Sequence, residues 1–326
     1  MGPLFSGRSR AVLAGLLALL APLSAAQALV INPLFVDAAG QTWSAARRAV
    51  FNRAIADWTT AILADQSVDV TVTFTHAGAG GYLGQWQVGG AFFNGTDIDP
   101  WTDGAEHTIR FNADLFSGDF YTWWDPTPTT SADLPFAAWD ALSVARHEIA
   151  HMMGFSSTFY LDNFNLPSEV NRWTSHISGT TFDPGGLNVT LASVSNLSHV
   201  ANSGSTAGDL MVPALVNGVR RSISQIDLDM LVLAHDYDLR PVGDFNGDAQ
   251  VTGADFLIWQ SRYPLAAGAT VSDGDANGDE AVTGADFLIW QSHYAPGAGT
   301  PVAVPEPAGG LMLVTGATAL LRRRKT

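Results

Sequence analysis

The chain has 326 residues, 47% of them hydrophobic, which is enough for a sizeable core and, by length, for two domains. Its formal charge is −15 and Lys325 is its only lysine, so it would repel the phosphates of a nucleic acid. It has no cysteine, which excludes disulfides and thiolate metal ligands. Any zinc ligand must therefore be His, Asp or Glu.

The first 28 residues have the pattern of an export signal. Arg8 and Arg10 precede an apolar run over 11–23, and the Ala-Gln-Ala at 26–28 is typical of a signal-peptidase site. The apolar run is too short for a membrane-spanning helix. We therefore predict a signal peptide over 1–28.

Residues 29–240 have the strand and helix patterns of one α+β domain. Strict alternation of apolar and polar residues predicts strands, and apolar residues spaced by three and four predict helices. The Gly-rich stretch 78–90 is predicted to be a connection. The predicted strands are 30–35, 68–75 and 107–112, and the predicted helices are 41–65 and 136–153.

A loop predicted at 115–135 is rich in aromatic residues. These side chains either line a substrate cleft or anchor the long loop to the core, which is the more usual role of aromatic residues. The residues concerned are Phe120, Tyr121, Trp123 and Trp124.

The stretch 156–207 is polar and rich in Gly, Ser and Asn, which predicts mostly loop, with one or two strands near 187–191. Ser222 and Gln225 have the spacing of a capping box and predict a final helix that runs to about His235. The domain boundary is predicted at Arg240-Pro241.

The predicted helix at 136–153 contains His147-Glu148-x-x-His151. Residues four apart lie on the same helix face, so the two imidazoles can share one metal ion. Glu148 lies beside them and is placed to accept a proton from a zinc-activated water. Gly154 is typical of the residue that ends a helix. The motif predicts a catalytic zinc site on this helix.

A catalytic zinc ion usually has three protein ligands and one open position. Ser157, three residues after Gly154, is not a convincing ligand. The remaining candidates for the third ligand are Glu169, His176 and His199. Met211, which is closely followed by Pro213, is either ordinary core filler or the Met of a turn that supports the zinc site.

The segments 147–156 and 198–213 together resemble the leishmanolysin-type metzincins. In that family an inserted segment separates the Gly of the motif from the third His, which precedes a Met-turn. The resemblance implies an α+β, metzincin-like catalytic domain with a twisted mixed sheet, an active-site helix and a C-terminal helix. The chain departs from the family in having no cysteine and in having Val200 where the family has an aromatic residue. We expect the strand at 107–112 to border the cleft and to pair with an extended peptide.

The same resemblance implies roles for individual residues. It implies that His147, His151 and His199 bind one catalytic zinc ion, that Glu148 is the general base, and that Met211 lies in the Met-turn. The implied activity is that of a zinc metalloendopeptidase, with a protein or peptide as substrate. The substrate sequence and the route of activation are not indicated by any residue pattern.

An internal repeat follows the domain boundary. Residues 243–264 align with 274–295, and 17 of the 22 positions are identical. Each copy contains Asp-x-Asn-Gly-Asp, whose oxygen atoms have the spacing of a calcium loop. Position six is Ala249 or Glu280 instead of Gly, and position twelve is Asp instead of Glu. The predicted calcium ligands are Asp244, Asn246, Asp248, Gln250, Thr252 and Asp255 in the first loop, and Asp275, Asn277, Asp279, Ala281, Thr283 and Asp286 in the second.

Two such loops, each followed by one helix, resemble the duplicated dockerin module. This resemblance implies a small α-helical, EF-hand-type domain over 241–296, two structural calcium ions and a cohesin-like partner. After a linker over 297–303, the segment 304–326 has Val-Pro-Glu-Pro, an apolar run and a basic end. This segment resembles the PEP-CTERM sorting signal of Gram-negative bacteria, which implies processing by an exosortase-type enzyme. The alternative for 304–326 is a permanent anchor.

These patterns predict a secreted or cell-surface zinc metalloendopeptidase, held transiently in the inner membrane through 304–326. The alternative is a non-catalytic surface or scaffold protein that docks through its calcium-binding module. An intact His147, Glu148 and His151 set argues for the enzyme, since a protein without activity need not keep the Glu.

Overall fold

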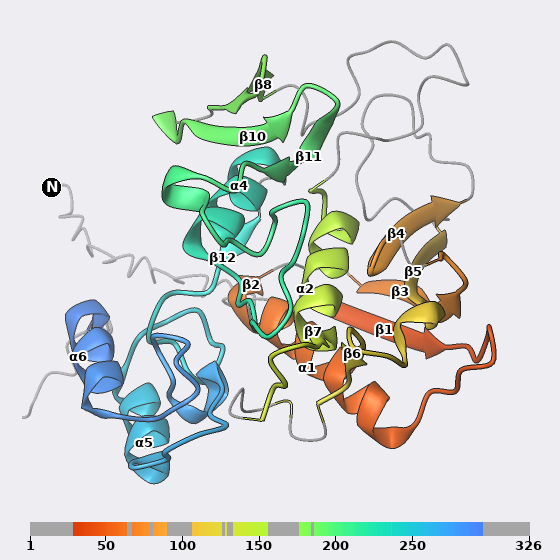
Figure 1. Ribbon diagram of the computed structural model, residues 1–326. Coiled ribbons are helices and arrows are strands. Elements are labelled where there is room, and N and C mark those ends of the chain that lie inside the picture. Colours follow the sequence, from red (N-terminus) through yellow and green to blue (C-terminus); the bar gives the residue numbers. More distant parts are fainter. Residues whose placement is uncertain are drawn as a thin grey trace, which may run out of the picture.

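The computed structural model describes residues 29–63, 67–78, 81–89, 106–125, 128, 133–155, 176–183, 186–235 and 237–295. The predicted signal peptide, the linker 297–303 and the C-terminal segment 304–326 lie outside the described residues. Within them the chain has a mixed α+β fold, with a large domain and a small helical module (Figure 1). No helix in the described ranges is both long and apolar enough to cross a membrane.

The large domain is built on a four-stranded sheet with the order β1-β3-β5-β4. Strands β1 (Val30–Phe35), β3 (Ser67–Thr75) and β5 (Glu106–Asn112) are parallel, and β4 (Gly84–Gly89) runs antiparallel to β5. Burial alternates along β3 because successive side chains point to opposite faces of a sheet. The strict Val/Thr alternation therefore places one buried face toward the helices.

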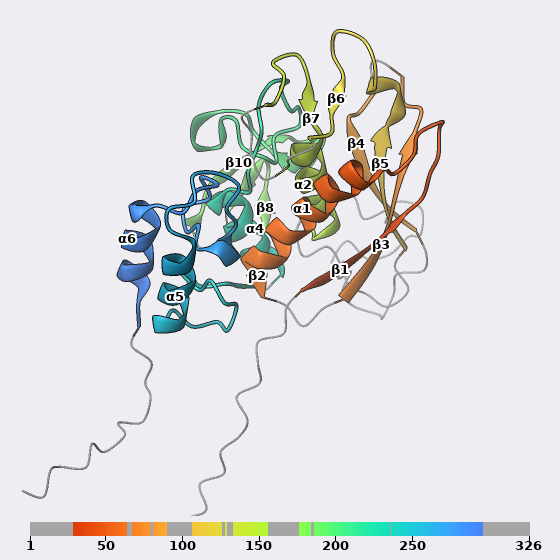
Figure 2. The same cartoon turned by 90° about the horizontal axis from the view of Figure 1, so that it is seen from below.

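Two helices cover that buried face (Figure 2). Helix α1 (Ala45–Ala61) begins at Ser44, whose hydroxyl accepts a hydrogen bond from a backbone amide of the first turn. Helix α2 (Ala141–Met152) begins at Asp140, which caps it in the same way. The prediction that this helix starts at 136 was wrong, because the Asp140 carboxylate accepts from the amide of Ser143 and fixes the start there.

The predicted connection at 78–90 contains β4, so that prediction was also wrong. Glycines at both ends of the segment concealed the strand, whose middle residues Gln85 and Trp86 pair with β5. Strand β5 is hydrogen-bonded on both sides, to β3 and to β4. The expectation that the strand at 107–112 borders the cleft is therefore replaced by β4, which forms the edge of the sheet.

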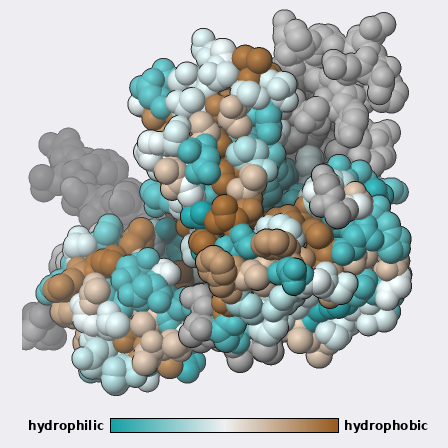
Figure 3. All heavy atoms as spheres, in the orientation of Figure 1, coloured by the Kyte–Doolittle hydropathy of each residue, from teal (hydrophilic) through white to brown (hydrophobic). Residues whose placement is uncertain are grey.

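A second, smaller sheet has the order β11-β10-β9-β8 and lies above α4 (Gln225–His235) in Figure 1. Its longer strands are β10 (Val189–Ser193) and β11 (Asn196–Val200). The shorter strands are β8 (Ile177–Ser178) and β9 (Thr181–Phe182). Figure 3 shows apolar surface gathered in the hollow between this upper lobe and the rest of the domain.

Helix α4 begins at Gln225, but its cap is not the predicted Ser222. Ser224 and Asp227 form a reciprocal pair instead: the Ser224 hydroxyl accepts from the Asp227 amide at 3.0 Å, and the Asp227 carboxylate accepts from the Ser224 amide at 2.8 Å. After α4, β12 (Asp238–Leu239) pairs with β2 (Ile62–Leu63) at the end of α1. Two further short strands, β6 (Thr122–Trp123) and β7 (Trp139–Asp140), pair in parallel ahead of α2.

The helical module contains α5 (Gly253–Arg262) and α6 (Gly284–His293), each at the end of one repeat. It has its own small core around Phe245, Val251 and Trp290. The two repeats also exchange hydrogen bonds: Trp259 Nε1 donates to the carbonyl of Thr283 at 2.8 Å, and Trp290 Nε1 donates to the carbonyl of Thr252 at 3.1 Å. These reciprocal bonds join the end of each loop to the helix of the other repeat.

Candidate metal centre

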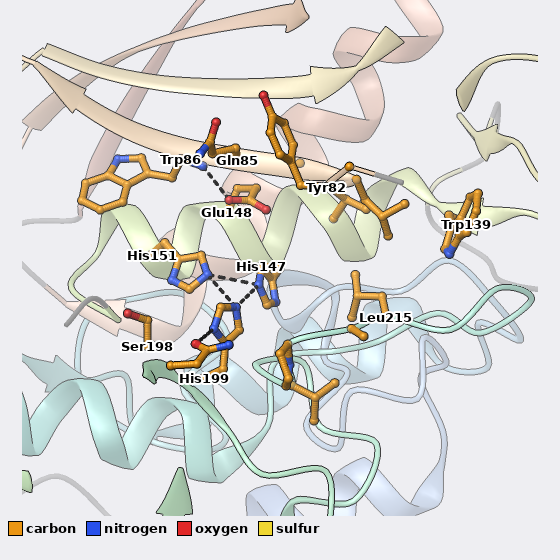
Figure 4. Close-up of a pocket in the computed structure, with 18 of the residues that line it drawn as sticks. Tyr82, Gln85, Trp86, Trp139, His147, Glu148, His151, Ser198, His199 and Leu215 are labelled. Carbon is orange, nitrogen blue, oxygen red and sulfur yellow. Dashed lines mark hydrogen bonds between the residues drawn. The ribbon is translucent and has the colours of Figure 1, made fainter. Parts of the chain in front are cut away.

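Three histidines meet at one point between the two lobes of the large domain (Figure 4). Helix α2 supplies His147 and His151, one turn apart, and β11 supplies His199. The Nε2 atoms lie 3.1 Å apart for His147 and His151, 3.1 Å for His147 and His199, and 3.2 Å for His151 and His199. Of the three candidates for a third ligand, the fold thus brings His199 to the motif.

The opposite nitrogen of each ring is held by an acceptor. Nδ1 donates to the carbonyl of Leu210 at 2.8 Å in His147, to the carbonyl of Phe155 at 2.6 Å in His151, and to Oδ1 of Asn196 at 2.6 Å in His199. Each Nδ1 therefore carries the proton, and each Nε2 presents a lone pair toward the other two. Because the rings offer no proton to one another, this His147–His151–His199 group could hold a metal ion.

The surroundings keep all three rings neutral. Burial lowers the pKa of His147, against the hydrogen bond to Leu210 and the charge of Asp209, which raise it. Burial and the charges of its two neighbours lower the pKa of His151 well below its usual value. Burial, and then His147, lower the pKa of His199 to about 3. Neutral imidazoles are the form that binds metals.

Met211 and its neighbours support the group from beneath. Met211 is fully buried, and its carbonyl accepts a hydrogen bond from the amide of Val200 at 2.9 Å. Its own amide donates to Oδ1 of Asp209 at 3.0 Å. Since the preceding residue, Leu210, receives the Nδ1 proton of His147, this turn fixes the positions of β11 and of one histidine together.

Glu148 lies beside the histidines, between α2 and β4 (Figure 4). It is only 5% exposed, and its Oε2 accepts a hydrogen bond from the amide of Trp86 at 2.7 Å. Burial raises the pKa of Glu148 to about 8, against the hydrogen bond from Trp86, which lowers it. A buried carboxyl with a pKa in this range can both take and release a proton near neutral pH.

Gly84 allows β4 to cross directly over Glu148. A Cβ atom at this position would lie 2.6 Å from a side-chain carbon of Val144 and 2.9 Å from the carboxylate of Glu148. Any side chain at residue 84 would therefore displace the strand or the carboxylate. The functional importance of Gly84 is not visible in the sequence, where it is one of several glycines in the stretch 78–90.

A cavity of about 610 Å³ contains the three histidines and Glu148. Strand β4 and the preceding Tyr82 form one wall, and Ser198 with the segment 212–215 forms the other. Trp86 and Trp139 add aromatic surface. This is a cavity of the size used for ligands, with few polar groups concentrated at one end.

The four aromatic residues of the predicted loop do not line this cavity, so the anchoring interpretation holds best for Trp124. Its ring lies 5.3 Å from that of Trp43 and 4.8 Å from that of Phe111, in the core. Phe120 is 56% exposed. The tryptophan that does line the cavity, Trp139, lies just beyond the predicted loop.

Of the other candidates for a third ligand, His176 lies just before β8, with its ring 5.9 Å from that of Phe182, and is not part of the histidine group. Glu169 and Ser157 lie outside the described residues. Sequence reasoning did not find the residues that orient the ligands, Asn196 and Phe155 among them. Two of these contacts use backbone carbonyls, which leave no mark on a sequence.

The two acidic loops share most of their internal hydrogen bonds. The first Asp of each loop is buried and accepts amides of its own loop: Asp244 from Gly247 at 2.7 Å and Asp275 from Gly278 at 2.7 Å. The last Asp of each loop is also buried, and the Thr at position nine caps the following helix. The predicted ligands at positions one, nine and twelve are Asp244, Thr252 and Asp255 in the first loop and Asp275, Thr283 and Asp286 in the second.

In the second loop the carboxylate oxygens of Asp275, Asp279 and Asp286 lie within 4.8 Å of one another. Burial, and the charges of Asp286 and Asp279, raise the pKa of Asp275 to about 6, against hydrogen bonds from the loop amides. The predicted ligands at positions three and seven hydrogen-bond to the Asp at position five of their own loop. Asn246 and Asn277 donate to the Asp two residues on, and the amides of Gln250 and Ala281 donate to the same Asp residues, Asp248 and Asp279.

A search against models of known protein families finds no match for this chain, and no curated protein matches its sequence.

Proposed function

We propose that this protein is a zinc-dependent metalloendopeptidase of the metzincin type. The observation that carries the proposal is the meeting of His147, His151 and His199 through their Nε2 atoms, with Glu148 buried beside them in one cavity. Three histidines with a carboxylate in a cavity are what a catalytic zinc site needs. The proposed metzincin-like domain comprises residues 29–240.

The spacing of the histidine nitrogens fits zinc. They form a nearly equilateral triangle with sides of 3.1 to 3.2 Å. Three nitrogens this close together can share one zinc ion at the usual zinc–nitrogen distance of ~2.0–2.1 Å, so His147, His151 and His199 would hold the ion together. The cavity beside the histidines has room for a substrate oxygen or water.

When bound, zinc acts as a Lewis acid that polarises a carbonyl and lowers the pKa of water. The work of the chain itself is then done by Glu148 and β4. Oε2 of Glu148 is fixed by the amide of Trp86, and a nearby cation would favour the ionised form of this carboxyl, which can then accept the proton of water. The same carboxyl donates that proton to the leaving amine.

The position of β4 at the edge of the described sheet supports binding of an extended peptide. One side of β4 is paired with β5, and the cavity lies along β4 on its other side. An extended substrate can add to such an edge through backbone hydrogen bonds. Strand addition would place a scissile peptide bond beside Glu148 and the histidine group.

The test is substitution of Glu148 by Ala in the purified protein. Because Glu148 is not a ligand, the variant should bind one zinc ion per chain, measured by elemental analysis, and should fail to cleave casein. Glu106→Ala, which removes an exposed carboxylate from β5, is the matched control and should cleave casein normally. Wild-type rates in Glu148→Ala would rule out its role as the base.

We also propose that the module over 241–296 binds two structural calcium ions and is dockerin-like. Buried carboxylates that face one another without an ion pair to any described cationic side chain, as in the second loop, fit a hard cation with oxygen ligands. Export through 1–28, sorting through 304–326 and processing by an exosortase-type enzyme complete the proposal of a cell-surface or extracellular protein.

A second function, docking to a partner, is supported by the surface of the module. Leu257 and Leu288 occupy equivalent positions in α5 and α6 and are 61% and 62% exposed. These two exposed side chains would supply apolar surface for such a contact. If the protein is a non-catalytic scaffold, wild type will not cleave casein even with zinc bound, and Leu257→Asp with Leu288→Asp will release it from a cohesin-like partner.

A further inference from the structure

The differences between the two repeats show which one faces the large domain. Five of the 22 aligned positions differ. At the third position of the alignment, Phe245 of the first repeat is buried in the module core. Its counterpart Ala276 packs against the same core and also lines a second cavity. At the seventh, Ala249 is replaced by Glu280, which lines the same cavity. Two of the five differences therefore lie at a single place.

This second cavity, of about 600 Å³, lies between the module and the large domain. One wall comes from α1, Arg146 of α2 and the start of α4. The rest of the lining comes from the connection 239–243, from 270–271 and from the second loop. The module is held near the C-terminal end of α1, where the Arg240 amide donates to the Ala61 carbonyl at 3.0 Å (Figure 2). Among the described residues, no residue of the first loop lines this cavity.

The wall on the large domain has an excess of positive charge. Two guanidinium groups share one carboxylate: Arg53 Nε lies 2.7 Å from Asp57 Oδ1, and Arg146 Nη2 lies 2.7 Å from Asp57 Oδ2. The Arg146 side chain is 4% exposed. Glu280 lines the same cavity as Arg53 and Arg146, so its carboxylate belongs to the wall that faces these two guanidinium groups.

Arg146 also connects the helices of the large domain. It precedes the first metal-site histidine in α2, and its carbonyl accepts from Nε1 of Trp58 in α1 at 2.9 Å. Its Nη1 donates to the carbonyl of Arg221 at 2.7 Å. A charge placed opposite Arg146 therefore acts on the back of the metal-site helix.

We propose that the second repeat is the face through which the module docks on the large domain, with Glu280 opposite the Arg53–Asp57–Arg146 cluster, and that calcium in the second loop stabilises the metal-site helix through this contact. The first loop has no such effect. This inference rests on the calcium binding put forward under the proposed function. It adds that only one of the two ions is coupled to the peptidase domain.

The position of Glu280 within its loop explains the coupling. Its amide donates to Oδ2 of Asp275 at 2.8 Å, and its φ of 65° places it in a left-handed conformation that costs energy for a residue with a side chain. Without a cation, Asp275, Asp279 and Asp286 repel one another and loosen the loop that presents Glu280. A bound ion removes that repulsion and fixes the Glu280 carboxylate toward the arginines.

The test uses the intact zinc-loaded chain and hydrogen exchange of the α2 amides, with and without calcium. The informative pair is Glu280→Gly and Ala249→Gly. Both substitutions place glycine at a residue in the left-handed conformation, with φ of 65° and 61°, which glycine adopts without strain. Only the first removes the carboxylate that faces the arginines. Asp275→Ala and Asp244→Ala form a second pair that disables one loop each.

Calcium should slow exchange in α2 about five-fold or more in wild type, in Ala249→Gly and in Asp244→Ala, a coupling of ordinary size. It should have no effect on α2 in Glu280→Gly or Asp275→Ala, although calorimetry should still find calcium bound to Glu280→Gly. Calcium bound to wild type without any change in α2 would overturn this inference alone. Failure of wild type to bind calcium would overturn the calcium proposal and this inference together, and would leave the zinc proposal standing.

Discussion

The histidine group and the acidic loops differ in where their ligands come from. The histidine group joins α2 to β11 across the interval between His151 and His199. The His147 ring is oriented by the distant carbonyl of Leu210, whereas His151 and His199 are oriented by acceptors four and three residues away in sequence. Each acidic loop has its carboxylates within one short stretch of chain, held by the amides of that same stretch. One site is assembled by the tertiary fold, and the other is assembled locally.

This difference predicts opposite relations between metal and folding. The histidine rings are neutral and packed, so their arrangement does not depend on an ion. In the second loop, three carboxylates lie close together, and Asp275 and Asp286 are almost fully buried. Their mutual repulsion and desolvation destabilise the folded loop unless a cation offsets them. We therefore expect a preformed zinc site and an ion-dependent calcium module.

The largest expected effect is on zinc binding in His199→Ala. Loss of one of three ligands should weaken zinc binding by more than the ~10–100-fold that follows loss of a ligand's hydrogen-bond partner. His176→Ala, which removes a histidine away from the group, should leave affinity unchanged. Competition with a chromophoric chelator measures both. Equal affinities in the two variants would show that the assembled site is not the zinc site.

The next effect is the loss of helix on removal of calcium but not of zinc. Removal of calcium with EGTA should reduce the helical circular dichroism of α5 and α6, since calcium at ~100 times its dissociation constant contributes about 2.7 kcal/mol to folding. Removal of zinc with phenanthroline should leave the far-ultraviolet spectrum unchanged. A loss of helix on zinc removal, or none on calcium removal, would contradict the distinction drawn above.

A smaller effect concerns the orientation of the third ligand. Asn196→Ala removes the acceptor of the His199 Nδ1 proton and should weaken zinc binding about 10–100-fold. Asn196→Asp keeps an acceptor in the same place and should restore most of the affinity. If Asn196→Ala binds zinc as wild type does, the packing of β11 alone orients His199.

The smallest effect is on stability and depends on pH. Burial, and the nearby carboxyl of Asp209, raise the pKa of Asp227 well above its usual value. The folded chain therefore retains a proton that the unfolded chain releases above ~pH 3.9, and stability falls as pH rises from there through the raised pKa.

Asp227→Asn removes that titration and leaves an oxygen that can accept from the Ser224 amide. The variant should be more stable than wild type at pH 8, by about 1–3 kcal/mol, the cost of an unsatisfied buried group. The gain should shrink toward pH 4. Urea denaturation at several pH values measures it, and a gain independent of pH would show that charge is not its cause.

Strong periodicity made the central elements predictable. The alternation of Val and Thr located β3 to within one residue. The His-Glu-x-x-His helix was predicted because two histidines four residues apart can share a metal ion only on one face of a helix. Among the boundaries that were wrong, the helix predicted over 41–65 extends only over Ala45–Ala61. The errors at 136 and at Ser222 arose because Asp140 and the Ser224–Asp227 pair cap these helices in place of other plausible caps. At these helix starts the sequence contains more than one residue that could cap the helix.

The parts that could not be predicted depend on distant contacts. Strand β4 was missed because glycine lowers strand propensity, yet Gly84 is required by the Glu148 carboxylate beneath it. The sequence left three candidates for the third ligand. Of His176 and His199, the two that lie among the described residues, the packing of β11 against the Met211 turn brings His199 to the motif. A sequence states which residues could bind, whereas the fold decides which of them meet.

The span between the ligands has a mechanical consequence. An ion held by His147, His151 and His199 would also be a cross-link, closing a loop of roughly fifty residues in a chain that has no cysteine. By the entropy that a covalent bridge of that loop length removes from the unfolded chain, such a link is worth about 4 kcal/mol. The ion would thus fasten the upper lobe to the helix, as a disulfide does in other proteins, and chelation would remove this contribution to stability while leaving the preformed arrangement in place.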